Sequence, residues 1–254
     1  MGKKLSLLPF GAVITGLGLW CCAAPADATI MIGVDWYSVN PSFGDFNLTP
    51  CGNTQDCGQL FNNGNPEVGT SLVGGLPVVS AGNPAGLVEG VGNPLNWWTP
   101  LAGEVTYEGT TTQPMPVMQN MFTPEGTGGS DSNSFQTVIF FATLNVGAGG
   151  GSITFGGDDD MFLALNGVVV DQVGGVHPYG TTSTFDLGQG TYAMEIFYAD
   201  RHVTAAYADI QFSGDITTGV PEPGTWALML IGFAGLGYAA HSRGRNGRLG
   251  SAIV

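Results

Sequence analysis

The stretch MFLALNGVVVDQ, residues 161–172, decides the fold class of this 254-residue chain. It contains two runs of strand-forming residues separated by Asn166 and Gly167. This dipeptide suits a type I′ hairpin turn, because both central residues of that turn need a positive φ. The stretch therefore predicts two antiparallel strands joined by a two-residue turn.

Further strand-like segments lie on both sides of this hairpin. FQTVIFFATLN (135–145) predicts a strand buried on both faces, and SITFG (152–156) follows a Gly-rich turn. Apolar and polar residues alternate in TYAMEIFYA (191–199) and AYADIQF (206–212), as they do in strands with one buried face. Short strands, frequent turns and no obvious helix predict an all-β fold, an antiparallel, jelly-roll-like β-sandwich.

The segment 29–129 is less regular. Gly, Asn and Pro recur in FNNGNPEVG and VGNPLNWW, which predicts long loops between short strands. GVDWYSV (33–39) and EVTYEGT (104–110) are candidate strands, either of the same sandwich or of a separate small lobe. We expect the sandwich domain to span residues 29–219.

The first 28 residues have the order of a secretory signal peptide. Lys3 and Lys4 precede an apolar run that ends at Trp20, and small residues follow. An uncleaved membrane anchor is the alternative, although the apolar run is short for a spanning helix. The pattern predicts a signal helix at 1–28 and export of the protein.

Export decides how the cysteines are interpreted. Cys21 and Cys22 belong to the signal, so the mature chain keeps Cys51 and Cys57. Two close cysteines in a Gly/Asn-rich loop of an exported protein predict a disulfide bond. A metal site is the alternative, but it would need further soft ligands nearby.

The charge of the domain restricts its partners. Between Thr29 and Gly219 there are eighteen Asp and Glu residues and one Lys or Arg, Arg201, so the formal charge is −17. Nucleic acids and anionic membrane surfaces are therefore poor partners, whereas cations are favourable ones.

The C-terminal region predicts a single transmembrane helix. The segment 225–240 carries no charge, and three arginines follow it, a pattern typical of a short spanning helix with a cytoplasmic basic flank. Pro221, Glu222 and Pro223 precede the apolar segment. In this order the three features resemble the PEP-CTERM sorting signal of Gram-negative bacteria, here at residues 220–248, with 249–254 as a tail.

This resemblance implies a sorting route for the protein. An inner-membrane-anchored precursor would be cut near Pro221–Pro223 by a membrane protease of the exosortase type. The product would then reach the cell surface or the extracellular matrix, where proteins with this signal commonly accompany exopolysaccharide.

Three consecutive aspartates, Asp158, Asp159 and Asp160, precede the strand that begins at Met161. Adjacent like charges are unfavourable unless a cation or water compensates them. Carboxylate oxygens suit Ca²⁺, and Gly156 and Gly157 would allow the sharp turn that brings neighbouring side chains together. A calcium site and a solvated acidic turn without a ligand both remain open, since the EF-hand spacing is absent.

The surrounding sequence resembles the fibro-slime domain. The shared pattern comprises Gly157–Asp160, Asn166-Gly167, Asp171, Gly174–His177 and an acid-Arg-His triplet at 200–202, where Asp200 replaces the usual Glu. The similarity is clearest from Phe155 to Phe212, and the best-matched part of the domain is 134–214.

Fibro-slime domains look like the protective-antigen-type β-sandwich. In sugar-binding adhesins of that group, an Asp-Asp pair joined by a cis peptide holds a Ca²⁺ that also touches sugar hydroxyls. That pair corresponds to Asp158 and Asp159, and Asp160 replaces a usual glycine. The resemblance implies calcium as the cofactor and, in some relatives, a polysaccharide ligand.

Other residues have a structural and a functional interpretation. His177 could join the site, or its imidazole could be bonded to a backbone carbonyl. Arg201 could recognise a substrate, or it could hold strands in register through carboxylates. Of Trp97 and Trp98, at most one could stack on a sugar, because adjacent residues of a strand face opposite sides.

The sequence favours an exported, non-catalytic surface or matrix protein that binds calcium and polysaccharide. A purely structural matrix protein with no ligand is the alternative. A polysaccharide-active enzyme using two carboxylates is a third hypothesis. Because no nucleophile elbow, HExxH or phosphate loop is present, we do not expect an enzyme.

Overall fold

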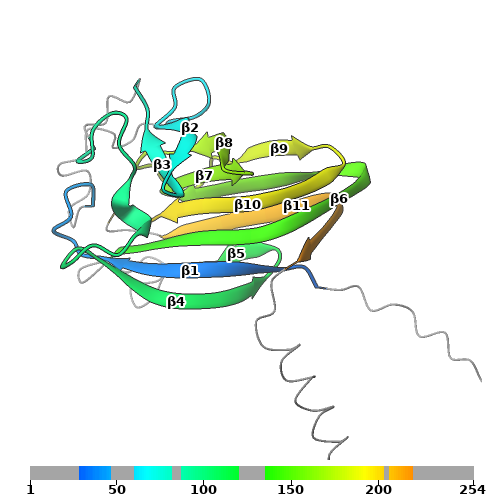
Figure 1. Cartoon of the computed structure of the whole chain (residues 1–254), viewed down its shortest axis with the longest axis horizontal. Coiled ribbons are helices and arrows are strands. Elements are labelled where there is room, and N and C mark those ends of the chain that lie inside the picture. Colours follow the sequence, from blue (N-terminus) through cyan, green and yellow to red (C-terminus); the bar gives the residue numbers. More distant parts are fainter. Residues whose placement is uncertain (1–28, 47–59, 82–86, 120–134, 203–205, 220–254) are drawn as a thin grey trace, which may run out of the picture.

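The computed structural model describes residues 29–46, 60–81, 87–119, 135–202 and 206–219. These residues form eleven strands and a short 3₁₀ turn, with no α-helix among them (Figure 1). The strands are β1 (Met31–Val39), β2 (Val68–Val73), β3 (Leu76–Val79), β4 (Val105–Pro114), β5 (Val117–Gln119), β6 (Phe135–Asp158), β7 (Asp160–Leu165), β8 (Val168–Val173), β9 (Ser183–Leu187), β10 (Gly190–Ala199) and β11 (Tyr207–Gly219), and the 3₁₀ turn is η1 (Asn96–Trp98). The strand pairs are antiparallel, which confirms the predicted all-β antiparallel class.

Three expected features fall outside the described residues. They are the signal helix at 1–28, the transmembrane helix at 225–240 and the Cys51–Cys57 disulfide. Within the described ranges, no helix has the length and apolarity needed to cross a membrane.

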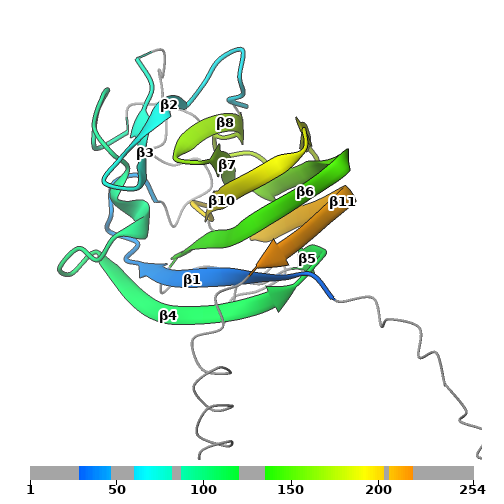
Figure 2. The same cartoon turned by 45° about the vertical axis from the view of Figure 1, so that its right-hand side comes forward.

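The strands are arranged in two layers that share β6. The first layer has the order β3-β2-β8-β7-β10-β6-β1-β4, and the second contains β9, β6, β11 and β5. The first part of β6 pairs with β1 and β10, whereas its last part pairs with β9 and β11. Figure 2 shows β6 between β10 and β11, with β1 and β4 along one edge. This arrangement is consistent with the predicted β-sandwich.

The central strand β6 corrects two predictions. It continues from Phe135 to Asp158 through the glycines at 147 and 149–151, where we expected a turn between two strands. Only its inward face is buried along most of its length, because Ile139 and Phe141 are half-buried and Thr143 is exposed on the other face. The continuous run of apolar residues had suggested burial on both faces.

The predicted hairpin is confirmed. Leu165 pairs with Val168, and the two turn residues, Asn166 and Gly167, have φ values of 52° and 79°. The side chain of Asn166 also contributes a tertiary contact, because its Oδ1 accepts a hydrogen bond of 2.9 Å from the backbone N–H of Ala193 on β10.

Two hydrophobic clusters fix the layers. The first fills the space between them and contains the inward residues that alternation predicted on β10 and β11, including Met194, Ile196 and Ile210. The second covers part of the outer face of the first layer, where the loop residue Phe46 packs on both Phe135 and Trp97. The early segments β1 and β4 extend the first layer, so these candidate strands belong to the sandwich.

Candidate functional site

The three aspartates form the connection between β6 and β7. Asp158 ends β6, Asp160 begins β7, and the peptide bond between Asp158 and Asp159 is cis, as the resemblance implies. All three side chains are buried, with exposed fractions of 6%, 1% and 0%. This burial does not match the alternative of a solvated acidic turn, since water does not reach these carboxylates freely.

Asp158 and Asp159 bind a loop that crosses this end of the sandwich, residues 174–182, which we call the strap. Asp159 Oδ1 accepts a hydrogen bond of 3.1 Å from the His177 N–H, and Asp158 Oδ2 accepts one of 3.2 Å from the Tyr179 N–H. Asp159 Oδ2 accepts a bond of 2.9 Å from the backbone N–H of Arg201. The pair therefore joins the strap to the end of β10.

Glycine is required where the strap crosses β6. A Cβ at Gly156 would lie 2.4 Å from the carbonyl oxygen of Thr181 and 2.9 Å from a side-chain atom of Thr182. The first of these atoms belongs to the backbone, so a side chain at this position would displace the strap. This close approach brings His177 and Tyr179 to the aspartates.

Asp160 has a different environment. Its Oδ1 accepts a hydrogen bond from the Gly175 N–H, and its Oδ2 lies 3.2 Å from Nε of Arg201. A guanidinium nitrogen of Arg201 also lies 2.9 Å from Oε1 of Glu67, and its guanidinium carbon is 4.7 Å from the centroid of the Trp97 ring. Arg201, Asp160 and Glu67 are completely buried, so removal of any one of them would leave a buried charge uncompensated.

Negative charge is in excess around this network. Glu67, the three aspartates and Asp200 are all buried, and Arg201 is the one Lys or Arg between Thr29 and Gly219. Burial raises the pKa of Asp158 to about 6, against the lowering effect of the Tyr179 N–H, Asp159 and His177. Burial, followed by the charges of Asp158 and Asp160, raises the pKa of Asp159 well above its usual value. Ionising both carboxyl groups together is therefore unfavourable unless a cation is present.

Tyr198 reports the same excess of negative charge. Its hydroxyl donates a hydrogen bond to the main-chain oxygen of Asp158. Burial raises the pKa of Tyr198 well above 10, and the charges of Asp200, Asp159 and Asp158 raise it further. Three carboxylates thus act on one buried hydroxyl.

His177 adopts the backbone-bonded arrangement. Its Nδ1 donates a hydrogen bond of 3.1 Å to the carbonyl oxygen of Pro178. Its Nε2 is buried and has no hydrogen-bond partner within the described ranges. The backbone N–H of His177 donates to Asp159 Oδ1, so this residue lies next to the aspartate pair, and its coulombic effect lowers the pKa of Asp158.

The tryptophans correct a prediction. Trp97 and Trp98 lie in η1, not on a strand, and both are buried. Trp97 Nε1 donates a hydrogen bond of 2.9 Å to Asp45 Oδ2, and Trp98 Nε1 donates one of 2.9 Å to the Tyr198 carbonyl. Neither ring is therefore available for stacking on a sugar.

The structure brings Asp158 and Asp159 together and directs Asp160 towards Arg201. No group of three or more His, Cys, Asp or Glu side chains gathers as a metal cluster within the described ranges. The sequence did not predict Glu67 or Tyr198 as site residues. For Glu67, only the tertiary fold brings it next to residues more than ninety positions away. For Tyr198, alternation along β10 predicted the inward direction but not the carboxylates around its hydroxyl.

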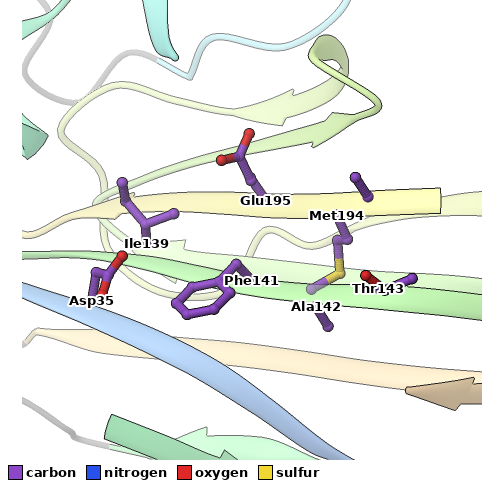
Figure 3. Close-up of a pocket in the computed structure, with 8 residues that line it drawn as sticks. Asp35, Ile139, Phe141, Ala142, Thr143, Met194 and Glu195 are labelled. Carbon is purple, nitrogen blue, oxygen red and sulfur yellow. The ribbon is translucent and has the colours of Figure 1, made fainter. Parts of the chain in front are cut away.

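A separate groove lies on the open outer face of the first layer. It has a volume of about 420 Å³ and contains Ile139 and Phe141 between Asp35 and Glu195 (Figure 3). Burial raises the pKa of Glu195, whereas Asp35 accepts hydrogen bonds from the hydroxyls of Tyr107 and Thr110. The register places the two acids on β1 and β10, with β6 between them, so their Cα atoms are roughly 12 Å apart.

In the comparisons with known proteins, a family model matches the C-terminal region of the chain. A family described as the PEP-CTERM protein-sorting motif matches residues 219–244. Protein psiQ of Dictyostelium discoideum is 36% identical over 73 residues, which are 27% of this chain and 7% of psiQ. The chain thus spans a small fraction of that relative.

Solved structures show only distant likeness. The GH31 α-xylosidase of Xanthomonas citri aligns with 44% of this chain and 15% of its own, at 13% identity and a TM-score of 0.31. The β-glucosidase of Kluyveromyces marxianus in complex with glucose aligns with 57% of this chain and 19% of its own, at 13% identity and a TM-score of 0.33. The sorting motif supports an exported protein that is processed by exosortase, a membrane protease.

Proposed function

We propose that this chain is a non-catalytic surface or matrix protein whose β-sandwich binds calcium, and polysaccharide next to the calcium, after export through the PEP-CTERM route. The observation that carries the proposal is the buried pair Asp158 and Asp159. Their neighbouring carboxyl groups have raised pKa values, and the nearby guanidinium of Arg201 is already bonded to Asp160 and Glu67.

The donor set fits a hard cation. Carboxylate oxygens are preferred by Ca²⁺, which takes six to eight oxygen ligands, including backbone carbonyls and water. Asp158 and Asp159 would supply the side-chain oxygens, whereas Asp160 would stay bonded to Arg201. Burial first, and then repulsion from Asp158 and Asp160, raise the pKa of Asp159, and a bound divalent cation would offset that repulsion.

A second candidate is a ligand-free structural role for the same residues. The hydrogen bonds from His177 and Tyr179 to the pair favour it, because they give each carboxylate a partner in the strap. The two candidates differ in one respect: only the calcium proposal makes the stability of the fold depend on the metal.

Thermal unfolding separates them. We expect the melting temperature of the full chain in detergent to rise when calcium is added after treatment with a chelator. At a hundredfold excess over Kd the gain corresponds to about 2.7 kcal/mol. Asp158→Asn should lose the rise, and Asp186→Asn, at an exposed position on β9, should keep it. A wild-type melting temperature that is the same in calcium and in chelator would support the structural role.

A further inference from the structure

Next to the aspartate pair, the exposed ring of Tyr179 packs on the half-buried ring of Tyr207, and we call these two rings the tyrosine platform. We propose that the tyrosine platform stacks against a neutral pyranose ring of a polysaccharide. This inference rests on the proposed function and deepens it, because it names the ligand class and the residues in contact.

Both tyrosines lie next to the same aspartate, Asp158. The backbone N–H of Tyr179 donates to Asp158 Oδ2 at 3.2 Å, and Tyr207 on β11 lies opposite Asp158 on β6 in the strand register. The two ring centroids are 4.2 Å apart, and Tyr179 is 42% exposed. A ring that stacks on Tyr179 would therefore lie next to the Asp158–Asp159 pair.

The direction of the Tyr179 ring is fixed before any ligand arrives. Its hydroxyl donates a hydrogen bond of 3.0 Å to Asp209 Oδ2, and Asp209 is itself buried. Gln211 Nε2 donates to both oxygens of Asp209, at 3.1 and 3.3 Å. Binding to a ring that is already held costs little side-chain entropy.

A polar hollow lies beside the last residues of the strap, Thr181 and Thr182. It has a volume of about 280 Å³, and its lining includes Asn63, Asp171, Thr181, Thr182 and Ser183. Thr181 follows Tyr179 by two residues, so at most about 7 Å of extended backbone separates the first lining residue of the hollow from Tyr179. Hydroxyl, amide and carboxylate groups beside an aromatic face are the groups that recognise a polyol.

Charge selects a neutral ligand. Arg201 is the one Lys or Arg between Thr29 and Gly219, and it is fully buried. This stretch of sequence therefore offers no exposed Lys or Arg for an anionic polymer. Neutral hexopyranose units can stack on Tyr179 and bond to the hollow without such a partner.

Saturation-transfer NMR on the full chain in detergent tests the inference. The probes are the methyl glycosides of glucose, galactose and mannose, with calcium present. We expect transfer to at least one glycoside from the wild type, at least tenfold weaker binding for Tyr179→Ala, and retained binding for Tyr179→Phe, which keeps the ring.

Tyr107 supplies a matched control. It is 45% exposed, its hydroxyl donates to Asp35, and it packs on another tyrosine, Tyr37, at 5.3 Å. Tyr107→Ala should therefore bind the glycoside as the wild type does. If Tyr179→Ala fails to fold, Tyr207→Ala tests the same platform from β11.

Calcium titration of the same samples keeps this inference apart from the proposed function. Calcium binding that survives in Tyr179→Ala while glycoside binding is lost supports the inference. Calcium binding by a wild type that takes none of the three glycosides overturns the inference alone. Glycoside binding that persists in both Tyr179→Ala and Tyr207→Ala overturns it as well. A wild type that binds glycoside through Tyr179 but binds no calcium contradicts the calcium proposal and still supports stacking of the pyranose ring on the tyrosine platform.

Discussion

Nε of Arg201 lies 3.2 Å from Oδ2 of Asp160, and both side chains are completely buried. This ion pair separates the third aspartate of the acidic turn from the first two. Asp160 bonds to Arg201, which also bonds to Glu67, whereas Asp158 and Asp159 accept hydrogen bonds from the backbone N–H groups of His177, Tyr179 and Arg201.

Removal of Arg201 should strongly destabilise the protein. Arg201→Met leaves Asp160 and Glu67 buried without their cation, and a loss of about 3–5 kcal/mol of unfolding free energy is expected. Urea denaturation measures this loss. The triple variant that adds Asp160→Asn and Glu67→Gln should recover part of the loss, because it removes the unpaired charges. A loss below about 1 kcal/mol for Arg201→Met would contradict this account of the network.

The hairpin turn allows a prediction at Asn166. Asn166→Ala loses the hydrogen bond to the Ala193 N–H. It also places alanine, which tolerates the left-handed backbone less well than asparagine, at a φ of 52°. The expected loss is about 2 kcal/mol, of which roughly half comes from the hydrogen bond and half from the left-handed backbone. Asn166→Gly should lose only the hydrogen bond. Equal losses for the two variants in chemical denaturation would show that the backbone conformation does not matter here.

Glu89 should make stability depend on pH. Burial, and then the hydrogen bond and charge of Asp45, raise the pKa of Glu89 to about 8, far above its value in the unfolded chain. Between about pH 4.5 and 8 the folded protein therefore holds a proton that the unfolded chain has lost. Stability from this group is complete below the unfolded pKa and is lost as the pH rises through about 8.

Glu89→Gln isolates that contribution. The amide keeps a hydrogen-bond donor towards Asp45 at every pH, so the variant should lose less stability than the wild type between pH 5 and pH 9. The difference reaches at most about 1.4 kcal/mol per pH unit. Melting temperatures measured in buffers of equal ionic strength test this. If the melting temperatures of the two proteins change with pH in parallel, Glu89 is not protonated next to Asp45 in the folded state.

Gly156→Ala should loosen the strap. Its Cβ would lie 2.4 Å from the Thr181 carbonyl, so the strap must move away from β6. The amides of His177 and Tyr179, which donate to Asp159 and Asp158, should then exchange with deuterium faster. Gly188→Ala is the control, because a Cβ there meets no atom closer than 4.0 Å. Unchanged exchange at both amides would show that the strap does not depend on this close approach.

Local patterns predicted the parts of the fold that depend on neighbouring residues. The type I′ turn at Asn166-Gly167 and the inward faces of β10 and β11 follow from preferences of single residues and from alternation, and the structure confirms them. The exposed outer face of β6 was not predictable in this way. Whether Ile139 and Phe141 are covered depends on where distant loops pack.

The candidate site was predictable only in part. The acidic run pointed to Asp158–Asp160, but the sequence could not show that Asp160 faces Arg201 and Glu67, since Glu67 lies 134 positions before Arg201. Trp97 and Trp98 were expected on a strand. Their side chains are instead fixed in η1 by acceptors on Asp45 and Tyr198, which only the tertiary structure supplies.

Isothermal titration of calcium into the full chain tests the central claim most directly. We predict heat of binding with one calcium per chain, its loss in Asp158→Asn and Asp159→Asn, and its retention in Asp186→Asn. The absence of binding heat at millimolar calcium, or heat that persists unchanged in both aspartate variants, would contradict it.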